Sequence, residues 1–88
     1  MNNFNLPELK QDSKDFEKRT KYLKWYLSLI SKYKNYNICE DIIIEKHHIL
    51  PKCMGGDNSR ENLVKLPVRE HILAHYLLMN IYTDNYKL

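Results

Sequence analysis

The sequence has little cysteine and little glycine, and it lacks a long apolar run. Its 88 residues include two cysteines, two glycines, three prolines and one tryptophan. Cys39 and Cys53 are too far apart for a CxxC pair and too few for a disulfide scaffold or a four-cysteine zinc site, so both are expected to be reduced thiols. No segment approaches the roughly 20 apolar residues of a membrane span, and the N-terminal MNNFNLPELK lacks the apolar centre of a signal peptide. These absences predict a cytoplasmic protein with no membrane partner.

The short length also limits what the chain can contain. A chain of this size buries only roughly 60–65% of its unfolded surface, so we expect a single domain without a large ligand cavity. Hydrophobic residues make up 43% and charged residues 28% of the sequence, which is typical of a globular protein. The net charge of +3 is uneven, because residues 1–34 carry eight cationic side chains against four acidic ones. Such asymmetry is expected where one element lies on a polyanion, but on charge alone a solvated helix face is the simpler interpretation.

Hydrophobic periodicity predicts two helices and two short strands. Residues 1–11 form an irregular arm, and residues 12–36 form a basic amphipathic helix, capped by Asp12 or Ser13, that packs on the core. A strand rich in β-branched residues runs from 42 to 48, and a second strand covers 63–66. A second helix covers 68–82, with Pro67 in its first turn. The predicted buried positions are Phe16, Leu23, Tyr26, Leu27, Ile30 and Tyr33 in the first helix and Ile72, Leu73, Leu77 and Leu78 in the second.

The four histidines fall into two close pairs that suggest a metal site. His71 and His75 are one helical turn apart, so they can share a metal ion, and His47 from the facing strand can supply a third ligand. Three protein ligands leave coordination positions open, as in catalytic sites. His48 is then free to act as a general base, because an ordinary imidazole has a pKa of about 6.5. On a phosphodiester, His48 would activate water while the metal stabilises the transition state and the leaving oxygen.

The segment EKHHILPKCMGGDNSRENLVKLPVREHILAHYLL resembles an HNH nuclease motif of the ββα-metal (His-Me finger) fold, particularly its phage and homing-endonuclease branch. His48 matches the first His of the motif, Asn62 the Asn and His71 the last His. The resemblance implies an α+β fold in which residues 40–82 form the nuclease core behind a long N-terminal helix. It also implies DNA as substrate, one divalent metal ion, and products with 5′-phosphate and 3′-hydroxyl ends. By this resemblance His48 is the general base, His47 and His71 are ligands, and His75 is an additional ligand, as in the colicin-like subset.

Some positions depart from the pattern of the family. Many homing relatives have Asp in place of His47, and in that subset the asparagine can itself be a ligand; here Asn62 is expected instead to hold the loop by side-chain to backbone hydrogen bonds and so to fix His48. Ligation by nitrogen alone accommodates Zn²⁺, Ni²⁺ or Mn²⁺ more readily than Mg²⁺. Glu45 is expected either to orient a ligand histidine or an arginine, or to face solvent. The candidate DNA contacts, for which a solvated surface is the alternative, are Lys52, Arg60, Arg69, Lys18, Lys21 and Lys24.

The sequence therefore predicts a metal-dependent HNH endonuclease of phage or homing type that acts on DNA. A monomer with one site would nick one strand, whereas a homodimer could cut both. The alternative is a truncated or degenerate HNH module that binds DNA or a partner without cleavage, and a nuclease toxin of the bacteriocin type would share the same chemistry. If the protein is encoded by a phage, it is expected to act in the host cytoplasm.

Overall fold

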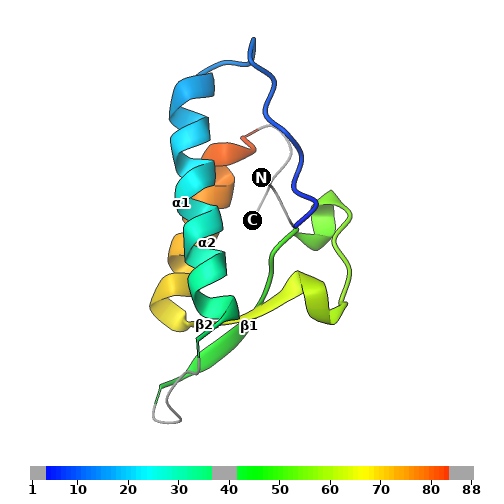
Figure 1. Cartoon of the computed structure of the whole chain (residues 1–88), viewed down its shortest axis with the longest axis vertical. Helices are drawn as coiled ribbons and strands as arrows, with labels where there is room; N and C mark the ends of the chain where they lie inside the picture. The colour runs from blue at the N-terminus through cyan, green and yellow to red at the C-terminus, as the bar shows by residue number, and fades with distance from the viewer. Residues whose placement is uncertain (1–3, 37–41, 84–88) are drawn as a thin grey trace.

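The protein is described by a computed structural model that covers residues 4–36 and 42–83, and these residues form an α+β fold (Figure 1). The long N-terminal helix precedes two antiparallel strands and a second helix, which gives a ββα order after α1. The elements are α1 (Phe16–Lys34), β1 (Ile44–His48), the single-turn 3₁₀ helices η1 (Lys52–Met54) and η2 (Arg60–Asn62), β2 (Leu63–Pro67) and α2 (Val68–Ile81). The predicted thiol Cys39, residues 1–3 of the predicted arm and residues 40–41 of the predicted core lie outside the described residues.

The two strands pair so that one face of the hairpin is turned toward the helices. In the antiparallel register His47 lies opposite Val64, His48 opposite Leu63, and Lys46 opposite Lys65. His47 and Val64 are buried, whereas Lys46 and Lys65 are exposed. Because successive side chains along a strand point to opposite faces of the sheet, the adjacent residues His47 and His48 are directed to different sides of the hairpin.

Helix α2 places its apolar stripe against α1 and the sheet. Ala74, Leu77, Leu78 and Ile81 are buried, and their spacing of three and four residues defines one helical face. The predicted burial of Leu77 and Leu78 is thus confirmed. The predicted burial of Ile72 is wrong, because 67% of this residue is exposed. At about 100° per residue, Ile72 lies roughly 200° from Ala74 and therefore faces away from the core.

Helix α1 begins later than the capping pattern predicts. Its first residue is Phe16, and its N-cap Asp15 has a left-handed backbone (φ 57°) and makes no side-chain capping hydrogen bond. The prediction that Asp12 or Ser13 caps this helix is therefore wrong. The physical reason is a turn before the helix, in which the Ser13 backbone N–H donates to the Lys10 carbonyl. This turn over residues 10–13 separates the N-terminal arm from the start of α1.

The N-terminal arm runs back alongside the helices (Figure 1). Leu6 is buried in the core, and the Tyr82 hydroxyl donates a hydrogen bond of 2.8 Å to the Pro7 carbonyl. Burial raises the pKa of Tyr82 to about 12, so its hydroxyl keeps its proton at neutral pH. Among the described residues, no helix is both long enough and apolar enough to cross a membrane.

Candidate metal centre and active site

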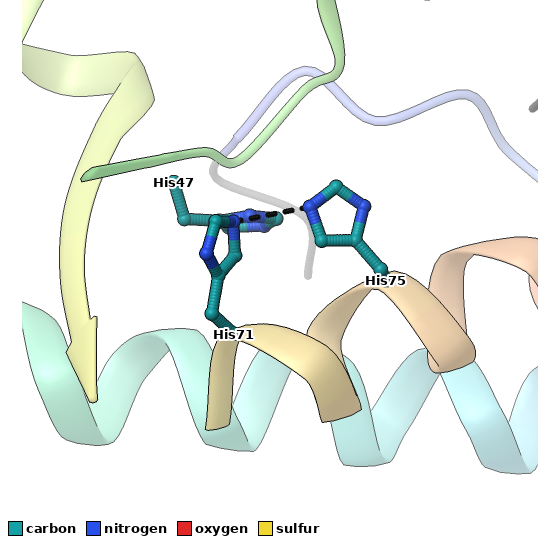
Figure 2. Close-up of side chains that lie close together, drawn as sticks. All are labelled: His47, His71 and His75. Atoms are coloured by element: carbon teal, nitrogen blue, oxygen red, sulfur yellow. Dashed lines mark hydrogen bonds between the residues drawn. The ribbon is translucent and has the colours of Figure 1, made fainter. Parts of the chain in front are cut away.

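Three histidines meet where the hairpin contacts α2 (Figure 2). His47 comes from β1, whereas His71 and His75 are on the same side of α2, one turn apart. Each ring offers one nitrogen, and these three nitrogens all lie within 4.8 Å of one another. The close approach is possible because the inward face of β1 packs on the start of α2, which directs His47 toward the two helical rings.

Hydrogen bonds determine which nitrogen of His71 is available. The Nδ1 atom of His71 lies 2.8 Å from the Oε1 atom of Glu45, and because a carboxylate only accepts, Nδ1 carries the proton. The lone pair of a neutral His71 is therefore on Nε2, which lies 3.0 Å from Nε2 of His75. Nε2 of His75 therefore donates its proton to Nε2 of His71. A cation between them would receive a lone pair from each ring instead, and the carboxylate of Glu45 would hold His71 in orientation.

The electrostatics of the cluster favour the neutral forms of His47 and His75. His47 is only 2% exposed, and burial, reinforced by nearby positive charge on His71, His75 and His48, lowers the pKa of His47 to about 3. Burial, followed by the charge on His71, also lowers the pKa of His75. Because only a neutral imidazole can bind a metal ion, these two groups are ready to serve as ligands at neutral pH.

The donor set therefore fits a divalent metal ion. Three imidazole nitrogens, one of them supported by a carboxylate, match the ligands that Zn²⁺, Ni²⁺ and Mn²⁺ accept, and fit Mg²⁺ less well, since Mg²⁺ prefers oxygen. Among the described residues, His47, His71 and His75 form the one group of three or more potential ligands that are close enough to share an ion. Cys53 is an exposed free thiol outside this group.

His48 lies at the end of β1, on the side of the sheet opposite to His47. Its Nε2 atom is 2.8 Å from the Oδ1 atom of Asn58. An amide oxygen only accepts, so Nε2 of His48 donates and the lone pair of the neutral ring is on Nδ1. His48 is half-buried, which leaves part of the ring open to solvent. The ring therefore has a fixed proton on one nitrogen and a basic site on the other.

Asn62 closes the loop between the two strands. Its Oδ1 atom accepts from the Leu50 backbone N–H at 2.8 Å, and its Nδ2 atom donates to the carbonyls of Leu50 at 3.0 Å and Asp57 at 2.8 Å. These three bonds tie both halves of the loop together just after His48. Gly56 sits against the same segment, where an added Cβ atom would lie 1.8 Å from the Leu50 carbonyl oxygen.

The candidate DNA contacts lie on separate surfaces. Arg60 lines two grooves beside the hairpin, and one of them also includes Asn58, the hydrogen-bond partner of His48. Lys18 and Lys21 line a hollow near the start of α1 that also contains Asp15 and Glu17. The remaining candidates are exposed and do not line the grooves beside the hairpin; they are Lys24, Lys52 and Arg69.

Sequence reasoning missed two residues of the site. The sequence predicts Tyr26 only as a buried core residue, yet its hydroxyl lies 2.8 Å from Nε2 of His47. Asn58, which bonds His48, lies in the segment between η1 and η2. The hydrophobic periodicity of the sequence gives no indication of the hydrogen bond between Asn58 and His48. The Tyr26 contact could have been found only from the packing of α1 on the hairpin.

The fold and the site define a class: a small α+β protein with a ββα arrangement and a three-histidine cluster that could hold a metal ion. Several of its relatives are phage proteins named as probable mobile endonucleases. Over 61 residues the chain is 46% identical to the probable mobile endonuclease E of Enterobacteria phage T4, a match that covers 69% of this chain and 43% of that protein. Over 67 residues it is 44% identical to the probable mobile endonuclease D of the same phage, covering 73% of this chain and 26% of that protein.

A more distant relative comes from an alga. An uncharacterized 38.5 kDa protein in psbA intron 1 of Chlamydomonas moewusii is 40% identical over 42 residues, which cover 48% of this chain and 12% of that protein. In each case the matched region spans less than half of the relative's length. No protein-family model matches the chain. No solved structure matches it either.

Proposed function

We propose that the chain is a metal-dependent DNA endonuclease of the HNH type, of the kind carried by mobile elements in phages. One observation carries the proposal: His47, His71 and His75 bring three nitrogens within 4.8 Å of one another, and His48, which follows His47 directly, has a free basic nitrogen. Homology to phage proteins named as probable mobile endonucleases supports the same reaction class. The enzyme would act on DNA, in the host cytoplasm if a phage encodes it.

His48 serves as the general base in this reaction. Its Nδ1 atom takes a proton from a water molecule, and the resulting hydroxide attacks the phosphorus while the bond to the 3′ oxygen breaks. The 3′ oxygen leaves as an alkoxide and takes a proton from solvent, so the products are a 5′-phosphate and a 3′-hydroxyl end. Asn58 holds the proton on Nε2 of His48, so Nδ1 is always the acceptor. Asn62 fixes the loop behind this ring, and its role in catalysis is thus to position His48.

The three-histidine cluster would hold the metal ion. A divalent cation bound by His47, His71 and His75 supplies Lewis-acid stabilisation of the charge that develops on the phosphate and the leaving oxygen. Glu45 keeps the Nε2 lone pair of His71 directed to the cluster through its bond to Nδ1. Nitrogen ligation favours Zn²⁺, Ni²⁺ or Mn²⁺ over Mg²⁺ as the working ion.

The DNA backbone would lie across the outer face of the hairpin. Lys46 and Lys65 are directly opposite each other on this face, and like charges in such a pair destabilise a sheet, so an anion between them would relieve their repulsion. Two adjoining grooves run beside them, and among the described residues that line these grooves there is no Asp or Glu. The cationic residues that line them are Lys34, Lys46, Arg60 and Lys65. One groove includes Asn58, which places this surface beside His48.

A pair of matched variants tests this DNA surface. Lys46→Gln/Lys65→Gln removes two positive charges from the hairpin. Lys18→Gln/Lys21→Gln removes two positive charges from α1 and serves as the control, because Lys18 lies roughly 24 Å along the helix from Lys34, which lines one of the grooves. Fluorescence anisotropy with duplex DNA in EDTA should show weaker binding for the hairpin variant, with the slope of log K against log salt reduced by about 2. Equal losses in the two variants would remove the hairpin from the proposed interface.

Plasmid cleavage with a panel of metals tests the proposed reaction. Supercoiled DNA should be nicked in Mn²⁺, Zn²⁺, Ni²⁺ or Mg²⁺ and left intact in EDTA. Nicked product alone is expected from a monomer, whereas linear product at early times would indicate a homodimer that cuts both strands. Salt-sensitive DNA binding without cleavage in any metal would instead identify a degenerate module that binds DNA or a partner.

A further inference from the structure

Tyr26 connects the N-terminal helix to the histidine cluster. It is on α1 and is completely buried, and its hydroxyl is engaged on two sides. The hydroxyl donates to the Ile49 carbonyl at 2.7 Å and lies 2.8 Å from Nε2 of His47. The two rings also meet edge to face, with their centroids 6.0 Å apart and an interplanar angle of 73°. A buried tyrosine in this position is not needed merely to fill the core, since a phenylalanine would fill nearly the same volume.

The two hydrogen bonds determine the tautomer of His47. A tyrosine hydroxyl has one proton, and a carbonyl oxygen can only accept, so this proton points to Ile49. The contact between the hydroxyl oxygen and Nε2 of His47 then requires the proton to be on Nε2. A neutral imidazole has only one N–H group. The lone pair of His47 is therefore on Nδ1, and this is the atom that remains for a metal ion.

We propose that Tyr26 is a positioning residue of the metal site, which fixes the tautomer and the orientation of His47 so that Nδ1 is the ligand atom. The proposal rests on the proposed role of His47 as a ligand. Through Tyr26, α1 becomes part of the site. The Tyr26 hydroxyl contacts His47 and also the carbonyl of Ile49, which follows His47 by two residues. The end of β1 is thereby held against the helix at two points.

Removal of the hydroxyl should weaken metal binding. In Tyr26→Phe, Nε2 of His47 has no partner at its present position, so the ring can rotate or exchange its proton between the two nitrogens. Loss of a group that orients a ligand histidine typically reduces metal affinity about 10–100-fold. Tyr82→Phe is a matched control, because Tyr82 is another buried tyrosine that donates to a backbone carbonyl but bonds Pro7 and not a histidine.

Two measurements on the full chain test the proposal. Long-range ¹H–¹⁵N spectra of the metal-free wild-type protein should show His47 as a single tautomer with its proton on Nε2, and Tyr26→Phe should lose this single state. Zn²⁺ affinity, measured by competition with a chromophoric chelator, should fall about 10–100-fold in Tyr26→Phe and should stay within about twofold of wild type in Tyr82→Phe.

Each outcome distinguishes the proposal from its alternatives. A proton on Nδ1 of His47 in the wild-type protein would overturn it, as would equal Zn²⁺ affinities of Tyr26→Phe and Tyr82→Phe. If Tyr26→Phe does not fold, the wild-type spectrum alone decides the tautomer. If the wild-type protein binds no metal, the metal-dependent function fails, but the spectrum of the metal-free protein still tests whether Tyr26 controls the His47 ring.

Discussion

Acid should destabilise the metal-free protein through His47. Burial, reinforced by charge on His71, His75 and His48, lowers the pKa of His47 from 6.5 to about 3 in the folded protein. The unfolded chain therefore binds a proton between pH 6.5 and pH 3 that the folded chain does not. By linkage, the stability that His47 contributes is present above pH 6.5 and is lost progressively as the pH falls toward 3.

The size of the effect follows from this difference in pKa. One pH unit corresponds to 1.36 kcal/mol for each proton taken up on unfolding. Between pH 7.5 and pH 5 the unfolded His47 changes from mostly neutral to mostly charged, so the free energy of unfolding should fall by about 2 kcal/mol from this residue. His75, whose pKa is also lowered by burial, acts in the same direction. A protein of this size has a total stability of only about 4–13 kcal/mol, so the loss is easily measured.

Urea denaturation of metal-free protein at constant ionic strength, between pH 7.5 and pH 5, measures this loss. His47→Gln is the comparison, because glutamine keeps an N–H donor and binds no proton in this range. The variant should lose about 2 kcal/mol less than wild type over the same interval. Parallel profiles would refute the reasoning. If the variant does not fold, an NMR titration of wild type decides, since an ordinary pKa for His47 would contradict the effect of burial.

Three further predictions concern stability and the loop, and each can be checked by urea denaturation. Gly56→Ala should cost about 1–3 kcal/mol or more, because the new Cβ atom would lie 1.8 Å from the Leu50 carbonyl oxygen; wild-type stability would show that the loop moves freely. Leu77→Ala should cost about 2–5 kcal/mol, whereas Ile72→Ala should change stability by less than about 0.5 kcal/mol; equal costs would contradict the assigned core face of α2. Asn62→Ala leaves backbone groups of Leu50 without their partner and should cost about 1–3 kcal/mol while Zn²⁺ affinity is retained; a large loss of Zn²⁺ affinity would instead make Asn62 a ligand.

The elements with a strong periodic signal could be predicted from the sequence. The order of helix, strand, strand and helix follows from hydrophobic spacing, and the close approach of His71 and His75 follows from their separation by one helical turn. The alternation of a strand also places His47 and His48 on opposite faces. These features depend on local geometry, which a sequence pattern reports directly.

Features that depend on packing between elements could not be predicted in this way. Ile72 looks like a core residue in the sequence, but α2 is covered on one side only, and the direction of that side is set by α1 and the sheet. The start of α1 is decided by a turn that brings the arm back to the core, not by Asp12 or Ser13. The contact between Tyr26 and His47 joins residues 21 positions apart, and nothing in the local sequence of either residue indicates it.

The central claim is that the base, His48, is separate from the three metal ligands His47, His71 and His75. Nicking of supercoiled plasmid and Zn²⁺ affinity, measured side by side in His48→Ala and His71→Ala, test it most directly. His48→Ala should abolish nicking while Zn²⁺ affinity stays within a few-fold of wild type, and His71→Ala should lose both. Nicking by His48→Ala at the wild-type rate would contradict the assignment of His48 as the base, and unchanged Zn²⁺ affinity in His71→Ala would contradict the assignment of the metal site.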